Sequence, residues 1–212
     1  MWAASTARAH AELLRCCRGL TKMSKPILQV IVASVRPTRI GGAVADWFIP
    51  IAESHAGFAV ERLDLREIAL PLIDEPYHPT KQMYEHEHTK RWSATITRGD
   101  AYVFVTPEYD FSPPASLLNA IQCLAKEWMY KPLGLVSYGG VSAGLRSAST
   151  LRIIATANSM MPLPGAVSIP FAGKLVDSEN AHFTPGEVQD KAATSLLGEL
   201  VRWERAMRVL RS

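Results

Sequence analysis

The sequence has few cysteines and no long apolar run. Cys16 and Cys17 are adjacent and Cys123 stands alone, so no disulfide framework is expected and a reducing cytoplasm is the expected location. No stretch of about 18 uninterrupted apolar residues exists, so there is no candidate for a membrane-spanning helix. With 48% hydrophobic residues in 212, the chain can bury a full core, and we expect a soluble protein with no membrane partner.

The main part of the chain also lacks an excess of basic residues. The net charge of +3 arises in residues 1–22, where four cations accompany one carboxylate, and the rest of the chain is balanced. Nucleic-acid binding needs clustered Lys and Arg, so no nucleic-acid partner is expected. Charged residues interrupt any signal-peptide block in the same segment. We interpret residues 1–23 as a poorly ordered or partly helical extension, with a targeting or partner-binding helix as the alternative, and residues 24–212 as one domain.

From residue 27 onward, strand-like runs alternate with segments of helical spacing. Nearly continuous apolar runs, typical of strands covered on both faces, occupy residues 27–34, 101–106, 133–138 and 166–169, and a more alternating run occupies 58–65. Helical spacing occurs at residues 42–55, 89–98, 115–127, 147–160 and 185–209. This alternation predicts an α/β fold, a flavodoxin-like three-layer sandwich with a five-stranded parallel sheet in the order 2-1-3-4-5.

Two long segments, residues 70–88 and 171–184, fit neither pattern. Long loops in compact domains are often functional, so we expect both to border the site or a subunit contact. The first contains His78, His86 and His88, but no cysteine or firmly placed carboxylate completes a ligand set. Solvated histidines are therefore favoured over a metal site, and no metal is predicted.

The chemistry is expected beyond the carboxyl ends of the strands, where open α/β sheets bind ligands. The loop after the first strand runs straight into a helix, whose N-terminus attracts anions. Its hydroxyls and arginines suit a phosphate monoester, although two exposed arginines on an ordinary solvated loop remain the alternative. Neither a Gly-x-Gly-x-x-Gly nor a P-loop motif is present. The residues that we assign to this loop site are Ser34, Arg36, Thr38, Arg39 and Gly41.

Two further loops follow the third and fourth strands. The first is stiffened by prolines and offers an aromatic wall to a flat heteroaromatic ring, with a simple rigid turn as the alternative. The second is rich in glycine, which allows the backbone to approach a ligand, with a mobile turn as the alternative. The residues concerned are Pro107, Glu108, Tyr109 and Asp110 in one loop and Ser137, Tyr138, Gly139 and Gly140 in the other.

Together, these loops resemble those of the NADPH-dependent FMN reductase family, which includes flavin, quinone, chromate and azo reductases on the flavodoxin fold. The resemblance covers most of residues 27–209. It rests on Ser34-x-Arg36-x-x-Arg39, Pro107-Glu108-Tyr109-Asp110 and Ser137-Tyr138-Gly139-Gly140. It implies that Ser34, Arg36, Thr38 and Arg39 hold the FMN phosphate, that residues 107–110 line the isoalloxazine, and that residues 137–140 contact its pyrimidine side.

The resemblance also implies a reaction and an assembly. Hydride would pass from NAD(P)H through FMN to a small acceptor such as a quinone, free flavin, azo compound or metal oxyanion. The cofactor carries such chemistry, so no catalytic side chain is expected. The alternative is a non-enzymatic FMN electron carrier or flavin-binding sensor, although carriers are usually acidic. A homodimer or tetramer is implied, with the predicted helices 115–127 and 147–160, Trp128 and Met129 as contact surfaces or, alternatively, as core.

The sequence departs from the family pattern at Asp110, where asparagine is usual. A carboxylate accepts hydrogen bonds but, unless protonated, cannot donate one to the ring. Its charge would also oppose the electron density of reduced flavin. We therefore expect a lower flavin potential than in an Asp110→Asn variant.

Overall fold

The computed structural model describes residues 25–177 and 182–211. The predicted extension, residues 1–23, lies outside these ranges. Strand β1 (Ile27–Val32) pairs in parallel with β2 (Ala59–Asp64) on one side and β3 (Ala101–Pro107) on the other. Strand β4 (Pro132–Tyr138) pairs with β3, and the sheet order is β2-β1-β3-β4-β5. The predicted flavodoxin-like fold is confirmed.

The fifth position of the sheet is divided between two short strands. Strands β5 (Met161–Pro162) and β6 (Val167–Ile169) each pair in parallel with β4. Only β6 falls within a predicted strand, residues 166–169. Pro164 lies between the two strands and has no N–H to donate, so the ladder is interrupted there.

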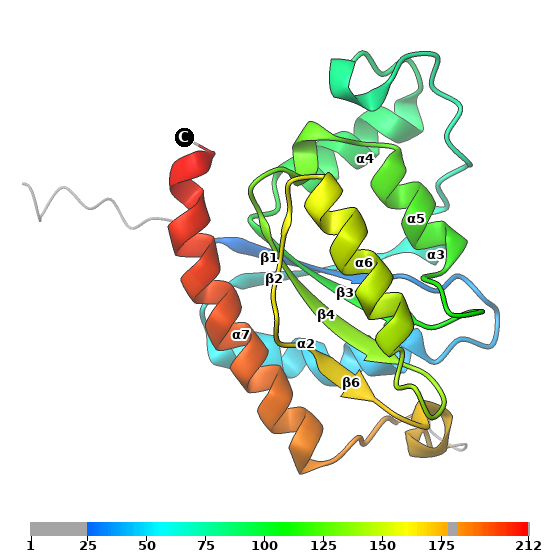
Figure 1. The fold of residues 1–212 in the computed structure, drawn as a ribbon, viewed down its shortest axis with the longest axis vertical. Coiled ribbons are helices and arrows are strands. Elements are labelled where there is room, and N and C mark those ends of the chain that lie inside the picture. The colour runs from blue at the N-terminus through cyan, green and yellow to red at the C-terminus, as the bar shows by residue number, and fades with distance from the viewer. Residues whose placement is uncertain (1–24, 178–181, 212) are drawn as a thin grey trace, which may run out of the picture.

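Helices cover both faces of the sheet (Figure 1). Helices α2 (Gly41–His55) and α7 (Glu187–Met207) pack on one face, and α4 (Glu87–Thr97), α5 (Ala115–Gln122) and α6 (Leu145–Ala157) pack on the other. Successive strand residues point to opposite faces, so each strand feeds both cores. Short helical turns complete the chain at α3 (Leu65–Ile68), η1 (Pro79–Lys81), η2 (Lys126–Trp128), η3 (Ala172–Leu175) and η4 (Arg208–Leu210).

The helix predicted for residues 115–127 ends at Gln122, so that prediction was too long. The Glu127 side chain accepts a hydrogen bond from the Ala125 N–H (3.2 Å), and a separate turn, η2, follows. Trp128 is fully buried and makes edge contacts with Trp92, Tyr102 and Phe104. Trp128 is therefore a core residue, which was the alternative interpretation of it.

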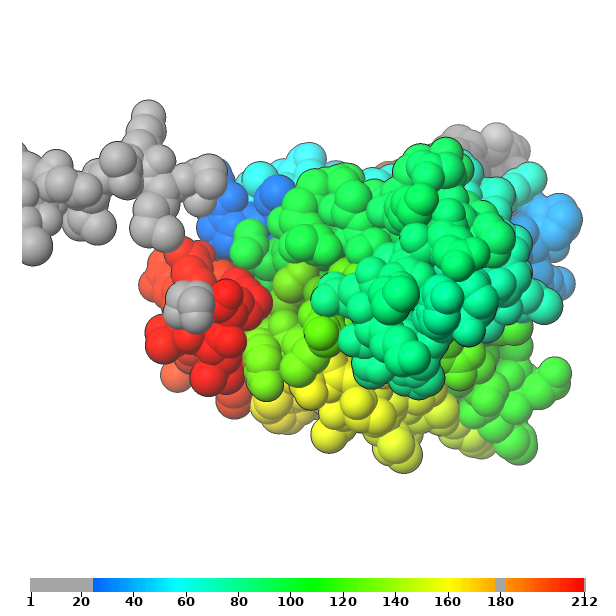
Figure 2. All heavy atoms as spheres, turned by 90° about the horizontal axis from the view of Figure 1, so that it is seen from above, coloured from blue at the N-terminus to red at the C-terminus, as the bar shows by residue number. Residues whose placement is uncertain are grey.

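Segment 70–88 is attached to the helices by two buried polar side chains. The Asn119 side chain accepts from the Ile73 N–H (2.9 Å) and donates to the carbonyl of Pro71 (2.7 Å). The buried Glu127 carboxylate accepts from the Tyr84 hydroxyl (2.9 Å). The segment covers much of the face seen in Figure 2, where it is coloured teal. His86 and His88 stack on each other within it, and no group of three metal-binding side chains occurs among the described residues.

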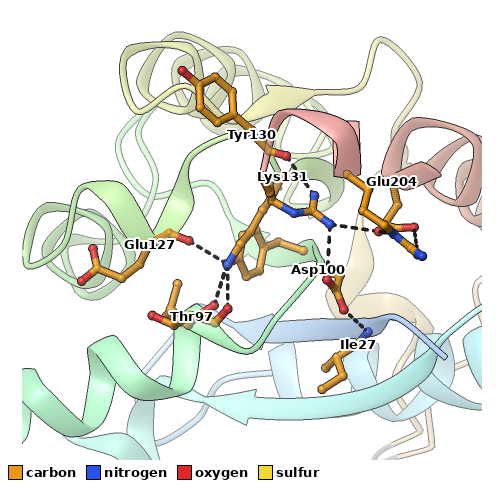
Figure 3. Close-up of polar contacts among 11 residues, drawn as sticks. Ile27, Thr97, Asp100, Glu127, Tyr130, Lys131 and Glu204 are labelled. Carbon is orange, nitrogen blue, oxygen red and sulfur yellow. Dashed lines mark hydrogen bonds and ion pairs between the residues drawn. The ribbon is translucent and has the colours of Figure 1, made fainter. Parts of the chain in front are cut away.

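Ion pairs join the C-terminal turn to the amino ends of the strands (Figure 3). Asp100 accepts from the Ile27 N–H (2.8 Å) and from Arg211 (3.3 Å). Arg211 also donates to the Tyr130 carbonyl (3.0 Å) and to Glu204 (2.9 Å), whose side chain is 1% exposed. These contacts fix η4 against the loops that precede β3 and β4.

Lys131, directly before β4, makes a separate set of hydrogen bonds near this network (Figure 3). Its ammonium donates to the carbonyls of Ile96 (3.0 Å) and Thr97 (3.1 Å), at the end of α4, and to the Tyr102 hydroxyl (3.0 Å). Burial, and the like charge of Arg211, lower the pKa of Lys131 to about 8. No helix in the described ranges is long and apolar enough to cross a membrane.

Candidate flavin site

The three candidate loops emerge from the carboxyl ends of β1, β3 and β4, which are neighbours in the sheet. The chain passes from β1 to β2 on one side and later to β3 on the other, so the topological switch lies between β1 and β3. In Figure 1 the loops after β1 and β3 project from the same side of the molecule. The structure therefore brings the predicted site residues to one edge.

Arg39 is held by Asp64, at the end of β2. Its two terminal nitrogens lie 2.6 and 2.7 Å from the two Asp64 oxygens, and one of them also donates to the Ser34 carbonyl (2.7 Å). The side chains of Arg39 and Asp64 are 11% and 1% exposed. Such a two-pronged pair fixes orientation. Arg39 thus fastens the loop after β1 to the neighbouring strand. Sequence reasoning overlooked Asp64, although it is an acidic residue at the end of a predicted strand.

The other residues of this loop divide into a buried and an exposed set. Ser34 is buried, and its hydroxyl lies 2.7 Å from the Tyr109 hydroxyl, which links the loops after β1 and β3. Arg36 and Thr38 are exposed. The Arg36 guanidinium lies 5.5 Å from the centre of the Tyr109 ring and has no carboxylate within 4.0 Å in the part of the chain that the structure describes. Arg36 is consequently available to an external anion.

The start of α2 meets a buried hydroxyl. Ile40 provides no side-chain cap, and no acidic residue occupies the first turn, so the first N–H groups of the helix have no side-chain acceptor there. A Cβ on Gly41 would lie 2.5 Å from the Tyr138 hydroxyl oxygen, which shows how closely the two approach. That hydroxyl is buried without a hydrogen-bond partner among the described residues. Burial, with the nearby Tyr109, raises the Tyr138 pKa, so the hydroxyl keeps its proton as a donor.

These features fit a monophosphate better than an apolar ligand. A buried hydroxyl left unpaired costs about 1–3 kcal/mol, and phosphate oxygens are strong acceptors. A helix N-terminus adds unpaired N–H groups and a partial positive charge. The resemblance implies that residues 137–140 contact the pyrimidine side of the flavin, which stays a prediction; the Tyr138 hydroxyl itself lies at the start of α2.

The loop after β3 forms a tight turn. Tyr109 and Ser112 exchange two backbone hydrogen bonds, at 2.9 and 2.8 Å, around Asp110 and Phe111. Both central residues have positive φ, 49° and 66°, which is the signature of a type I′ turn. Pro107 is buried as the last residue of β3. The loop thus contains a tight turn, which was the alternative interpretation of it, and the tip of the turn is exposed.

Glu108 joins this loop to the next one. Its carboxylate accepts from the Ser142 hydroxyl (3.0 Å), the Arg146 N–H (3.0 Å) and the Arg146 guanidinium (2.6 Å). Burial acts to raise the Glu108 pKa, but the hydrogen bonds from Arg146 and Ser142 outweigh it and lower that pKa. The carboxylate therefore stays charged and holds the start of α6, so its side chain is occupied within the protein.

The loop after β4 is also held from within. The buried Ser137 hydroxyl donates to the Ala143 carbonyl (2.9 Å). Gly139 donates to Ile169 (3.2 Å), and Gly140 accepts from the Phe171 N–H (2.9 Å). No atom lies within 4 Å of where a Gly140 Cβ would stand, so the backbone there is open. The start of segment 171–184 thus contacts the loop after β4.

A cavity of about 330 Å³ opens beside the first loop. Val35, Leu65, Arg66 and Ser116 are among the residues that line it. A larger cavity, about 600 Å³, lies away from these loops, between η2 and the end of α6. Hydrogen-bond donors and sheet topology, not cavity size, identify the candidate site.

A parallel sheet in this order, with an uncapped helix start at its switch point, defines a flavodoxin-like protein. A family model described as NADPH-dependent FMN reductase matches residues 27–174. The chain belongs to this family, and it is an FMN-dependent oxidoreductase with NAD(P)H as cosubstrate.

Two relatives agree with this membership, and a solved structure agrees with the fold. The chain is 41% identical over 138 residues to an NAD(P)H-dependent FMN reductase of Schizosaccharomyces pombe, covering 64% of this chain and 68% of the relative. It is 30% identical over 142 residues to an NADPH:quinone oxidoreductase of Arabidopsis thaliana, covering 61% and 67%. The solved structure of the Paracoccus denitrificans flavoenzyme FerB is similar in fold, with a TM-score of 0.66, 21% identity and coverage of 86% and 98%.

Proposed function

We propose that the three loops hold FMN and that the enzyme transfers hydride from NAD(P)H to a quinone. The observation that carries this assignment is the unpartnered Tyr138 hydroxyl beside the uncapped start of α2. Relatives named as quinone reductases in Arabidopsis thaliana and Pseudomonas putida support the acceptor. Free flavin, azo compounds and metal oxyanions are further acceptors of the same reaction.

The phosphate end of the site uses both direct and indirect contacts. We assign direct contacts to Arg36, Thr38, the Tyr138 hydroxyl and the N–H groups that begin with Gly41. Ser34 and Arg39 act as positioning residues, because their polar groups already pair with Tyr109 and Asp64. An Arg–carboxylate pair of this geometry keeps the loop in its binding conformation before the ligand arrives.

At the end of the site assigned to the flavin ring, the proposed contacts come more from the backbone than from side chains. Bound FMN would supply the hydride acceptor and donor. Pro107, Tyr109, Asp110, Gly139 and Gly140 line the ring in this assignment. Glu108 and Ser137 support the lining indirectly, since they hold the following loops through Arg146 and Ala143.

The proposal also covers the cellular location, the assembly and the domain organisation of the chain. We assign a cytoplasmic location, supported by the free thiol of Cys123, and a homodimer or tetramer. Leu145 and Ile153 are 52% and 74% exposed on α6, a helix named above as a contact surface. We retain residues 24–212 as the reductase domain and residues 1–23 as an extension, because the family match begins at residue 27.

One experiment tests cofactor and reaction together. The purified protein is titrated with FMN while its absorbance spectrum is recorded, and NADPH is then added without oxygen. The proposal predicts bound flavin that NADPH bleaches rapidly and that a quinone restores. A flavin that NADPH alone fails to bleach would indicate an electron carrier, and a preparation that gains no flavin would indicate a protein with an empty site.

A further inference from the structure

Phe111 breaks a local rule of turn geometry. A type I′ turn needs positive φ at both central residues, so Asn or Asp followed by Gly is preferred. Asp110 suits the first position, because short polar side chains tolerate left-handed backbone. Phe111, at φ 66°, occupies the position that favours glycine. Its side chain therefore costs conformational energy that glycine would not.

Burial does not offset that cost. Phe111 is 67% exposed, although it is a large apolar residue. The Arg146 guanidinium lies 4.1 Å from the ring centre, and Glu108 holds that guanidinium in place. A cation over an exposed ring stabilises it only modestly. A strained, exposed aromatic that the fold does not need is the kind of feature that functional sites retain.

The position of Phe111 in the fold indicates its function. It forms the tip of the turn that follows Pro107, Glu108 and Tyr109, and it touches Arg146 in the first turn of α6. The ring therefore spans from the loop after β3 to the start of α6, where the loop after β4 ends. Aromatic rings favour offset stacking with other flat rings.

We propose that Phe111 is the stacking platform for the planar electron acceptor, which makes it a specificity-determining residue for quinones. This inference rests on the proposed function. In the reaction, one hydride from NAD(P)H, carried through FMN, and one proton from water convert the quinone to the hydroquinone, leaving NAD(P)⁺. Phe111 takes no part in bond making. It holds the acceptor flat against the site, whereas an octahedral acceptor such as ferricyanide has no ring to stack.

Three variants test the platform. Phe111→Gly removes the ring and relieves the turn, and Phe111→Tyr keeps a ring. Tyr130→Gly is the matched control, because Tyr130 is also aromatic, 38% exposed and at positive φ (59°), but lies before β4 at the other end of the sheet. For each FMN-loaded protein, 1,4-naphthoquinone binding to the oxidised form is measured by calorimetry, together with Tm and the ratio of kcat/KM for naphthoquinone to that for ferricyanide.

For Phe111→Gly we expect naphthoquinone affinity and the kcat/KM ratio to fall about 3- to 10-fold, as loss of one aromatic stack requires. Its Tm should equal or exceed that of the wild type, because glycine suits the turn. Phe111→Tyr should restore affinity, and Tyr130→Gly should leave the ratio unchanged.

Unchanged naphthoquinone affinity in Phe111→Gly would overturn the inference. So would a fall in Tm accompanied by an equal loss with both acceptors, because that pattern indicates a structural role. A wild-type protein that binds no FMN, or that NADPH fails to reduce, would instead overturn the proposed function itself.

Discussion

The two ends of the parallel sheet differ in how their polar groups are paired. At the amino end, the charges of Lys131, Arg211, Asp100 and Glu204 all have partners within the protein (Figure 3). At the carboxyl end, the buried Tyr138 hydroxyl has no described partner. Two side chains near the amino end also each have one unpaired buried atom: the Gln29 amide oxygen, whose nitrogen donates twice, and His55 Nδ1.

This difference distinguishes the polar groups that stabilise the fold from those that can bind a ligand. Closed networks hold chain segments together, whereas unpaired donors at a strand terminus are complementary to something outside the chain. The carboxyl end also contains internally paired charges, the Arg39–Asp64 pair and the Glu108–Arg146 pair. Variants at the amino end should therefore change stability alone, while variants at the carboxyl end should change binding, except where one of these pairs is broken.

Arg39→Leu should give the largest effect. It leaves the buried Asp64 carboxylate with the Arg66 N–H (3.0 Å) and a longer contact to Arg62 (3.4 Å), and no close cation. Loss of one partner of a buried ion pair costs about 3–5 kcal/mol, so the free energy of unfolding in urea should fall by roughly that amount. Arg202→Leu, which removes an exposed pair with Glu199, should cost under about 1 kcal/mol. Equal effects of the two variants would show that the Arg39 pair is not structural.

Lys131 should contribute to stability in a pH-dependent way. Its pKa falls from 10.5 to about 8 on folding, so between these values the folded state binds fewer protons than the unfolded state. Its contribution to stability should thus rise as pH increases from 8 to 10.5, by at most about 3 kcal/mol. The measurement is the difference in unfolding free energy between wild type and Lys131→Met across this range. A difference in unfolding free energy that does not change with pH would contradict this expectation. FMN affinity should be equal in both proteins.

Tyr138→Phe should stabilise the FMN-free protein but weaken FMN binding. Without FMN, removing the unpaired hydroxyl should stabilise the fold by about 1 kcal/mol. With FMN, losing a hydrogen bond should weaken binding about 5-fold, as expected for roughly 1 kcal/mol. Thermal unfolding of the FMN-free protein and FMN titration report the two effects. Weaker binding accompanied by a less stable FMN-free protein would mean that the hydroxyl has an internal role.

Asp110→Asn should give the smallest change. If Asp110 lines the ring as proposed, replacing its carboxylate with a neutral amide should raise the two-electron flavin potential, by on the order of 20 mV for about 1 kcal/mol. Both residues tolerate the left-handed backbone at this position, φ 49°, so stability should not change. Potentiometric titration with a reference dye measures the shift. Identical potentials would reject the electrostatic effect.

Much of the fold was predictable from the sequence because β-branched runs such as residues 101–106 mark buried parallel strands. The site loops were predictable because they follow those strands. The division of the fifth strand was not, since it depends on one proline between two short pairings. Nor was the pairing of Arg39 with Asp64, because an ion pair across 25 residues leaves no local pattern. The placement of the Tyr138 hydroxyl depends likewise on close approach to Gly41.

The central claim is that the start of α2 and its loop bind the FMN phosphate. Its most direct test is the FMN dissociation constant of Arg36→Ala, measured by flavin fluorescence titration of the FMN-free protein beside Arg202→Ala. Loss of a charge-assisted contact predicts binding about 10- to 100-fold weaker in Arg36→Ala, with an unchanged urea midpoint and no effect of the control. A dissociation constant equal to that of the wild type, in a folded Arg36→Ala protein, would contradict the account.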